Sequence, residues 1–591
     1  MVNLKNLRKQ KKTPSKCLDK ISQVRNSVIS RPRPKQKISS ITWLILPLPL
    51  LACNNDNKKI LGLAGNAASE GIENLFKENP SVATAYKISS NTPVSSTGDG
   101  SNSLPIEVTS AVVASPTISG YPLLDFTFSA AGTVDFSNVS DVKNIAISNS
   151  TAGASLTNLS ANIEKIYVKE TQSGDWIMSF APNSLATLYL DWTNNSGASV
   201  DLTSLTLNEV KQLAFKNSGN EPITIPLLNL DPEDTQRIEI GNDNDGNIII
   251  GSATNITGAT ALKTMSLTTW NDGDITLGVA GTSGLPDVQQ LSSIAINASG
   301  TGSITLGDLG GTTPINNLSS IAISTEGAPV SIGSISVKKI DNIIASGTEF
   351  SSITFGTMAI EETISAFTLS GKADFTLGAF SGDGTINLNA SGMIKKGISL
   401  DFSGLKGSVD ITTTNQDDTI SLGVGSGKVI SGAGKDTITV VANATGNADI
   451  RTGEGVDEIT LSDLKGIDIV QPGGTRVSTI YGASVSHAEI LADKIINFDP
   501  SSDKISFGST TADTNNFSSA TGANTFSDAL SKANTAMGSG KIYYTSYNVA
   551  AATDGFSLIF YDSDGNGSSD LCLSLVGITT DVITFDHLVI A

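Results

Sequence analysis

The chain has 591 residues, and charged side chains make up 16% of it, below the roughly 25% of an ordinary soluble domain. Aromatic residues contribute 5% and glycine occupies 56 positions, which favours a thin, turn-rich β protein over a compact enzyme. Two histidines and three cysteines exclude a disulfide-stapled scaffold and a His-rich or Cys-rich zinc site.

The net charge of −19 is divided unevenly along the chain. Residues 1–40 hold 12 basic residues and one acidic residue, which leaves 26 basic and 56 acidic residues elsewhere, a balance of −30. An acidic body of this kind repels nucleic acid, so we expect no nucleic-acid partner. Its carboxylates suit surroundings rich in Ca²⁺, a hard cation that takes oxygen ligands.

A short apolar run follows the basic stretch and ends at Cys53. Its 12 residues, Ile41–Ala52, are too few to span a bilayer as a helix, and they include Pro47 and Pro49, so the run predicts the core of an export signal. The ending Leu-Leu-Ala-Cys resembles a bacterial lipoprotein box, which implies lipidation of Cys53. The leader is long for that family, so a signal of another kind and an uncleaved basic tail stay open as alternatives.

Pairs of short alternating stretches then repeat along the chain. Ile294-Ala-Ile296 precedes Ile304-Thr-Leu306-Gly307, and Ile321-Ala-Ile323 precedes Val330-Ser-Ile332-Gly333. The closing glycines recur every 22 to 29 residues from 251 to 378, a period typical of solenoids. One unit cannot bury its apolar face alone, but stacked coils can. We therefore predict a parallel β-solenoid over 131–400, with a sandwich array as the alternative because the repeats are irregular before about 235.

A nine-residue repeat follows, in which Ile420, Val429 and Ile438 are equally spaced. Its best copies read Gly-x-Gly-x-Asp-x-apolar, and they resemble the repeats-in-toxin (RTX) nonapeptide. That resemblance implies a parallel β-roll whose glycine turns expose carbonyls and whose aspartates complete an oxygen cage for Ca²⁺. The implied Ca²⁺ ligands are Asp418, Gly432, Gly434, Asp436, Gly453, Gly455 and Asp457. The copies are degenerate, so we expect one to three ions, and a metal-free continuation of the solenoid is the alternative.

The last hundred residues have a different pattern. Residues 493–507 resemble the segment that follows RTX repeats in exported proteins, and the tail resembles a secretion region for the type I secretion machinery. A helix is predicted over 525–537, with Thr525 or Ser527 as its N-cap, and strands at about 541–547, 555–561 and 570–576. The turn 562–570 matches part of an EF-hand loop but has Leu573 where Glu is expected, so we predict a polar turn without metal.

Patterns of catalytic residues are weak. The chain has no His-Glu-x-x-His and no Gly-x-Ser-x-Gly with a plausible histidine partner. His487 and His587 are predicted to be structural or surface residues. Asp243-Asn-Asp245 would suit a polysaccharide lyase that uses Ca²⁺, but no basic partner is apparent, so we expect a solvated turn. The sequence therefore predicts no enzyme.

Together these features resemble RTX-type surface-layer proteins of Gram-negative bacteria. The expected fold is all-β: a parallel β-solenoid that leads into a short Ca²⁺-binding RTX-like β-roll and a small β-rich secretion domain with one helix. The resemblance implies a secreted, Ca²⁺-dependent coat protein on the outer surface of the outer membrane, which self-assembles and contacts cell-surface polysaccharide or lipopolysaccharide. A monomeric adhesin or carbohydrate-binding rod is the alternative, and a β-solenoid polysaccharide lyase is a weaker one. The predicted domains are a leader (1–53), a linker (54–130), the solenoid (131–400), the roll (401–475) and the secretion-like domain (476–591).

Overall fold

The computed structural model describes residues 86–589 within one compact unit, 66–591. Residues left out within that range are 90–94, 98–102, 170–172, 183, 185, 194–199, 253–255, 280, 282–283, 442–445, 462–467, 472–474, 477–491, 508–510, 522, 524, 549–555 and 579–581. The predicted signal, Cys53 and His487 lie outside the described residues.

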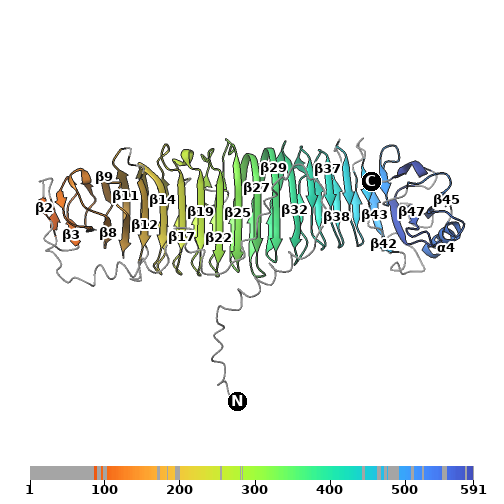
Figure 1. The fold of residues 1–591 in the computed structure, drawn as a ribbon, viewed down its shortest axis with the longest axis horizontal. Coiled ribbons are helices and arrows are strands. Elements are labelled where there is room, and N and C mark those ends of the chain that lie inside the picture. Colours follow the sequence, from red (N-terminus) through yellow and green to blue (C-terminus); the bar gives the residue numbers. More distant parts are fainter. Residues whose placement is uncertain are drawn as a thin grey trace, which may run out of the picture. The chain divides into compact units, whose positions relative to one another are not determined.

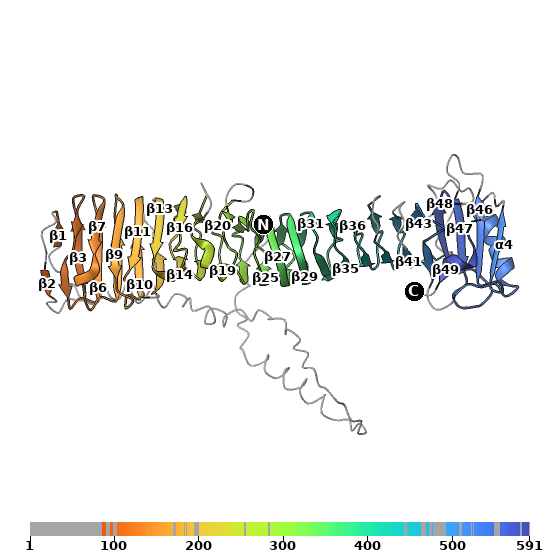
Figure 2. The same cartoon turned by 90° about the horizontal axis from the view of Figure 1, so that it is seen from above.

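Parallel strands stack coil upon coil (Figures 1 and 2). The first sheet runs the length of the stack, and each coil is completed by a strand of the second sheet as far as β30 (Asp374–Leu377) or of the third sheet from β33 (Ser399–Asp401) onward. The first sheet contains β1 (Tyr86–Ile88), β3 (Ser103–Val108), β6 (Leu123–Phe128), β8 (Asn144–Ser148), β10 (Lys165–Lys169), β12 (Ala186–Trp192), β14 (Val210–Asn217), β17 (Arg237–Asn242), β19 (Thr264–Thr269), β21 (Gly284–Leu285), β22 (Ser293–Ser299), β24 (Asp308–Leu309), β25 (Leu318–Glu326), β27 (Ile335–Gly347), β29 (Met358–Gly371), β31 (Phe380–Gly382), β32 (Thr385–Met393), β34 (Gly404–Leu405), β35 (Val409–Thr412), β37 (Gly427–Ile430), β39 (Ala448–Arg451), β41 (Ile469–Gln471), β44 (Lys504–Ser506) and β49 (Leu588–Val589).

The second and third sheets complete the coils. The second contains β4 (Val113–Ala114), β7 (Gly132–Asp135), β9 (Ala154–Leu159), β11 (Ser173–Phe180), β13 (Val200–Asn208), β15 (Ile223–Ile225), β16 (Leu227–Asn229), β18 (Ile248–Ile250), β20 (Ile275–Leu277), β23 (Ile304–Leu306), β26 (Pro329–Ile332), β28 (Ser352–Phe355) and β30 (Asp374–Leu377). The third contains β33 (Ser399–Asp401), β36 (Thr419–Leu422), β38 (Thr437–Val440), β40 (Glu458–Thr460), β42 (Thr475–Arg476), β43 (Asp493–Ile496), β45 (Phe517–Thr521), β46 (Tyr543–Asn548), β47 (Phe556–Tyr561) and β48 (Leu571–Val576). A separate pair joins β2 (Ser95–Thr97) to β5 (Thr117–Ser119).

The core of the solenoid lies between the sheets and is built from alternate residues of each strand. Ile294 of β22 aligns with Ile321 of β25, which aligns with Ile343 of β27, and all three side chains are buried. Each apolar side chain is thus covered by its equivalents in the coils above and below, as the repeat predicts. The predicted parallel β-solenoid is confirmed, and the sandwich alternative is wrong.

The coils begin earlier than the sequence predicts. Residues 54–130 read as a linker, yet β1 pairs with β3, β3 with β6 and β6 with β8, all in parallel within the first sheet. This stretch lacks the closing glycine that marks the later coils, which is why its repeat is hidden in the sequence.

The C-terminal region adds one described α-helix to antiparallel strands. Helix α4 (Phe526–Met537) begins at its N-cap Thr525, whose hydroxyl accepts the N–H of Asp528, and Gly538 follows its last residue. Its buried face packs with Phe560 of β47, and β46, β47 and β48 are antiparallel. Strand β48 also pairs with β43, so this region continues the stack of coils. Short 3₁₀ helices are η1 (Phe136–Asn138), η2 (Ala259–Ala261) and η5 (Phe585–His587).

Candidate metal centre

Four aspartates form a continuous column at the start of successive strands of the third sheet. Asp418, Asp436 and Asp457 directly precede β36, β38 and β40, and Asp493 is the first residue of β43. The N–H of Asp418 donates to Oδ1 of Asp436 (2.9 Å), that of Asp436 to Asp457 (2.9 Å), and that of Asp457 to Asp493 (3.2 Å). We call these four residues the aspartate column. Each is at most 1% exposed.

The middle of the aspartate column holds two carboxylate oxygens without a hydrogen-bond partner. These are Oδ2 of Asp436 and Oδ2 of Asp457, both shielded from solvent. The hydroxyl of Ser431 donates instead to the carbonyl of Thr452 (3.1 Å). An anionic oxygen buried without a partner is costly, so this position favours either protonation or a cation.

Asp418, the first member of the column, is placed differently from its successors. Its Oδ1 accepts the N–H of Ile398 (2.7 Å), and its Oδ2 accepts the N–H of Thr414 (3.1 Å). The hydroxyl of Thr414 also lies within hydrogen-bond distance of both oxygens. Asp418 is therefore already satisfied by its own coil and the one before, which makes it the weakest of the three predicted aspartate ligands.

Burial raises the pKa of the column's carboxyl groups. It raises the pKa of Asp436 to about 7, where the charges of Asp457 and Asp418 add a smaller contribution in the same direction. Desolvation by burial also raises the pKa of Asp418 and of Asp457, against the opposing effect of the hydrogen bonds that they accept. The carboxylate form is thus disfavoured in the fold as it stands, and a nearby cation would favour it.

The glycines predicted as ligands form the turn beside this column. Gly432, Gly434, Gly453 and Gly455 all have positive φ, between 85° and 151°. A Cβ at Gly455 would lie 1.7 Å from the carbonyl oxygen of Gly434, and one at Gly453 would lie 1.9 Å from that of Gly432. Only glycine lets the backbones of successive turns approach so closely. The structure thus gathers the predicted glycines and aspartates in adjacent coils.

A second column, on the side of the first sheet, was not recognised as a site from the sequence. The N–H of Ala448 donates to Asp468 Oδ1 (2.9 Å), and the N–H of Asp468 donates to Asp503 Oδ1 (3.2 Å). Both aspartates are buried, and burial raises the pKa of Asp503 to about 6. The signal in the sequence is an Asp-x-apolar triplet, which these residues share with the aspartate column.

The acidic turn 562–570 brings three carboxylates together. One oxygen from each of Asp562, Asp564 and Asp570 lies within 4.8 Å of the others. Among the residues described, this is the only group of three possible metal-ligating side chains that lie so close together. Asp562 accepts the N–H groups of Gly565 (2.8 Å) and Gly567 (2.9 Å), and Asp570 accepts that of Ser563 (2.8 Å). Backbone N–H groups therefore hold these carboxylates in place within the turn.

Two of the residues considered for catalysis, Asp243 and His587, make structural contacts. Asp243 was expected in a solvated turn without a basic partner, but it forms a largely buried ion pair with Lys216 (2.8 Å). That lysine lies one coil earlier, on β14, so local sequence could not indicate it. His587 is buried and its Nε2 lies 2.6 Å from the carbonyl of Pro500, a structural role.

No family model matches this chain, and a search of curated proteins found no match either. Among the helices described, none is long and apolar enough to cross a membrane.

Proposed function

We propose that the aspartate column and the glycine turns beside it bind Ca²⁺. The observation that carries this proposal is the pair of buried oxygens without partners, Oδ2 of Asp436 and Oδ2 of Asp457. The carbonyl oxygen of Gly434 is close by, since a Cβ on Gly455 would meet both it and Oδ1 of Asp457, so the ligand set consists of oxygen atoms alone. Such a set suits a hard cation of the size of Ca²⁺ better than a transition metal.

Ca²⁺, when bound, supplies positive charge to carboxylates that the fold has removed from water. The residues of the column link the coils, because the Oδ1 atom of each accepts a hydrogen bond from a backbone N–H of the previous coil. The glycines let the backbones of successive turns approach closely, with the carbonyl of Gly434 where a Cβ on Gly455 would otherwise lie. Because an ion bound to the folded state alone shifts folding by mass action, Ca²⁺ would stabilise these coils.

We further propose that the protein is a secreted, non-enzymatic coat component that assembles on the cell surface where Ca²⁺ is abundant. Support comes from the stacked coils, the acidic body and the resemblance of residues 405–591 to RTX proteins exported by type I systems. In a compartment with little Ca²⁺ the column would lack its cation, and the coils that carry it would be weaker. Outside the cell the same coils would be completed.

The test uses the full chain with millimolar Ca²⁺ or with EDTA, examined by negative-stain electron microscopy. We expect ordered sheets or tubes with Ca²⁺ only, and their loss in the triple variant D418N/D436N/D457N. The matched control is D410N, which removes an exposed aspartate from neighbouring β35. Separate particles in both conditions would refute the coat function, and unchanged arrays in the triple variant would refute the metal site.

A carbohydrate-binding rod is the second candidate, and one observation favours it. An open groove of about 950 Å³ crosses three coils and is lined by polar and apolar turn residues and by Tyr189, which is partly exposed. An exposed aromatic ring among hydroxyls and charged groups is a suitable platform for a sugar. Binding of the wild-type chain to a glycan array, lost in Y189A, would favour this function over the coat.

A further inference from the structure

Two large apolar side chains protrude from one edge of the solenoid. Phe350 is 86% exposed in the loop between β27 and β28, and Ile394 is 66% exposed in the loop after β32. These loops belong to coils two steps apart, and the Nζ of Lys395 donates across the intervening coil to the carbonyl of Glu349 (3.1 Å). We call Phe350 and Ile394 the knob, and the lysines beside them its rim. Exposed apolar side chains gathered in this way mark an interaction site.

The rim of the knob is basic in a chain whose net charge is −19. Lys372, Lys395 and Lys396 are all substantially exposed, and their nearest carboxylates, Glu349 and Asp374, lie 3.5 to 3.8 Å away. Exposed pairs at such distances contribute little to stability, so Lys372 and Lys396 are available to a partner.

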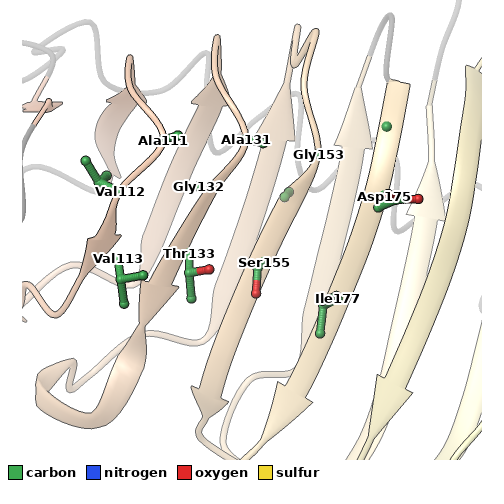
Figure 3. Close-up of a pocket in the computed structure, with 12 residues that line it drawn as sticks. Ala111, Val112, Val113, Ala131, Gly132, Thr133, Gly153, Ser155, Asp175 and Ile177 are labelled. Carbon is green, nitrogen blue, oxygen red and sulfur yellow. The ribbon is translucent and has the colours of Figure 1, made fainter.

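A shallow apolar trough of about 470 Å³ lies further toward the N-terminus (Figure 3). Val113, Thr133, Ser155 and Ile177 are aligned in register across β4, β7, β9 and β11, as a row along it. Val113 is 62% exposed and Ile177 is 38% exposed. A Cβ at Gly153 would lie 2.6 Å from the carbonyl of Asp175, so close packing of the coils keeps this floor free of side chains.

The charge around the trough is opposite to that of the knob. Asp135, Asp175 and Asp201 lie on β7, β11 and β13, on the outward side of their strands. The described strands from β4 to β15 of the second sheet carry no basic residue. The trough therefore offers an apolar floor with an acidic border, which complements an apolar knob with a basic rim.

The knob and the trough lie along the same edge of the solenoid. Residues 348–351 join β27 of the first sheet to β28 of the second, and residues 129–131 join β6 to β7 in the same way. Seven strand pairings lead from β11 to β28, which at about 4.8 Å each corresponds to roughly 34 Å.

We propose that this edge is an interface between two antiparallel copies of the chain, in which the knob of each copy seats in the trough of the other. A two-fold axis makes both contacts equivalent, as closed symmetry requires. One knob presents only two large apolar side chains, far less than the roughly 800 Å² per partner of a standard interface, and the two-fold axis doubles that contact. This inference rests on the proposed self-assembly and supplies its first contact.

The test measures the monomer–dimer equilibrium of the full chain by sedimentation velocity. We expect a dimer that F350S/I394S weakens by about 100-fold or more, because apolar burial is lost at two equivalent contacts. The control V582S, which removes an exposed apolar side chain outside this edge, should leave the equilibrium unchanged. K372E/K396E should also weaken the dimer, and adding D175K/D201K to it should restore association.

Other outcomes would overturn the inference. A wild-type monomer would do so, and so would a dimer that F350S/I394S leaves intact or a charge reversal that D175K/D201K does not rescue. A wild-type monomer that sediments with phosphatidylglycerol vesicles through Phe350 would reassign the knob to a lipid surface. Since the knob and trough lie outside the aspartate column, the dimer should persist in EDTA. A dimer without Ca²⁺-dependent arrays would sink the proposed coat function and leave this interface standing.

Discussion

The carboxylate of Asp436 makes stability depend on pH in a direction unusual for an aspartate. Its pKa in the fold is about 7, against 3.8 for the free side chain, so the folded state binds the extra proton between these values. Stability without metal therefore falls as the pH rises through this window. A shift of about three pKa units corresponds to roughly 4 kcal/mol as an upper limit, because each unit is worth about 1.4 kcal/mol.

We accordingly predict the behaviour of D436N in EDTA. Asparagine keeps an acceptor for the N–H of Asp418 but cannot ionise, so the variant should gain roughly 2–4 kcal/mol over wild type at pH 8 and little at pH 4. In Ca²⁺ at pH 8 the order should reverse, because the variant loses a ligand. Thermal unfolding across this pH range, with and without Ca²⁺, measures both differences. A pH-independent difference in EDTA would contradict the raised pKa.

Gly455 illustrates how the turn geometry depends on single residues. Its φ is +151°, and a Cβ there would lie 1.7 Å from the carbonyl of Gly434. We predict that G455A costs roughly 3–5 kcal/mol, since both strain and collision oppose it. The control G281A has φ of +70° but open space around its Cβ, and should cost roughly 1–2 kcal/mol. Equal shifts of the urea midpoint for both variants would show that the close approach contributes nothing.

At the scale of elements, helix α4 depends on its N-terminal cap. The Thr525 hydroxyl accepts the N–H of Asp528 in the first turn (3.1 Å), where the helix supplies no carbonyl acceptors of its own. We expect T525A to lower stability by about 1 kcal/mol. The control T535A removes an exposed hydroxyl that bonds to the carbonyl of Ser531 within the helix, and should change stability by less than about 0.5 kcal/mol. Denaturant unfolding of the two variants decides, and equal losses would argue against the cap.

The elements also show what the sequence could predict and what it could not. Helix α4 and its strands follow from local signals, and so do the glycine turns, because each is determined by neighbouring residues. The aspartate column is harder, since its members are 18, 21 and 36 residues apart. A search at fixed spacing finds Asp436 but misses Asp493. The partner of Asp243 and the knob depend on which residues the stacking places side by side, and unequal coil lengths hide that from the sequence.

For the whole stack of coils, stability should vary with position. Backbone pairing joins each coil to its neighbours, so solenoid stability is approximately a sum of local contributions. The aspartate column connects β36, β38, β40 and β43, whereas the core around Ile294, Ile321 and Ile343 contains no buried carboxylate among the residues described. Removing Ca²⁺ should therefore open the first group of strands and leave β19, β22 and β25 protected. Hydrogen exchange of the wild-type chain with and without EDTA measures this directly. The exchange pattern of D436N in Ca²⁺, where one ligand is lost, should resemble that of the wild-type chain in EDTA. A uniform loss of protection along the coils would mean that the stack unfolds as one unit and that the column holds no special place in it.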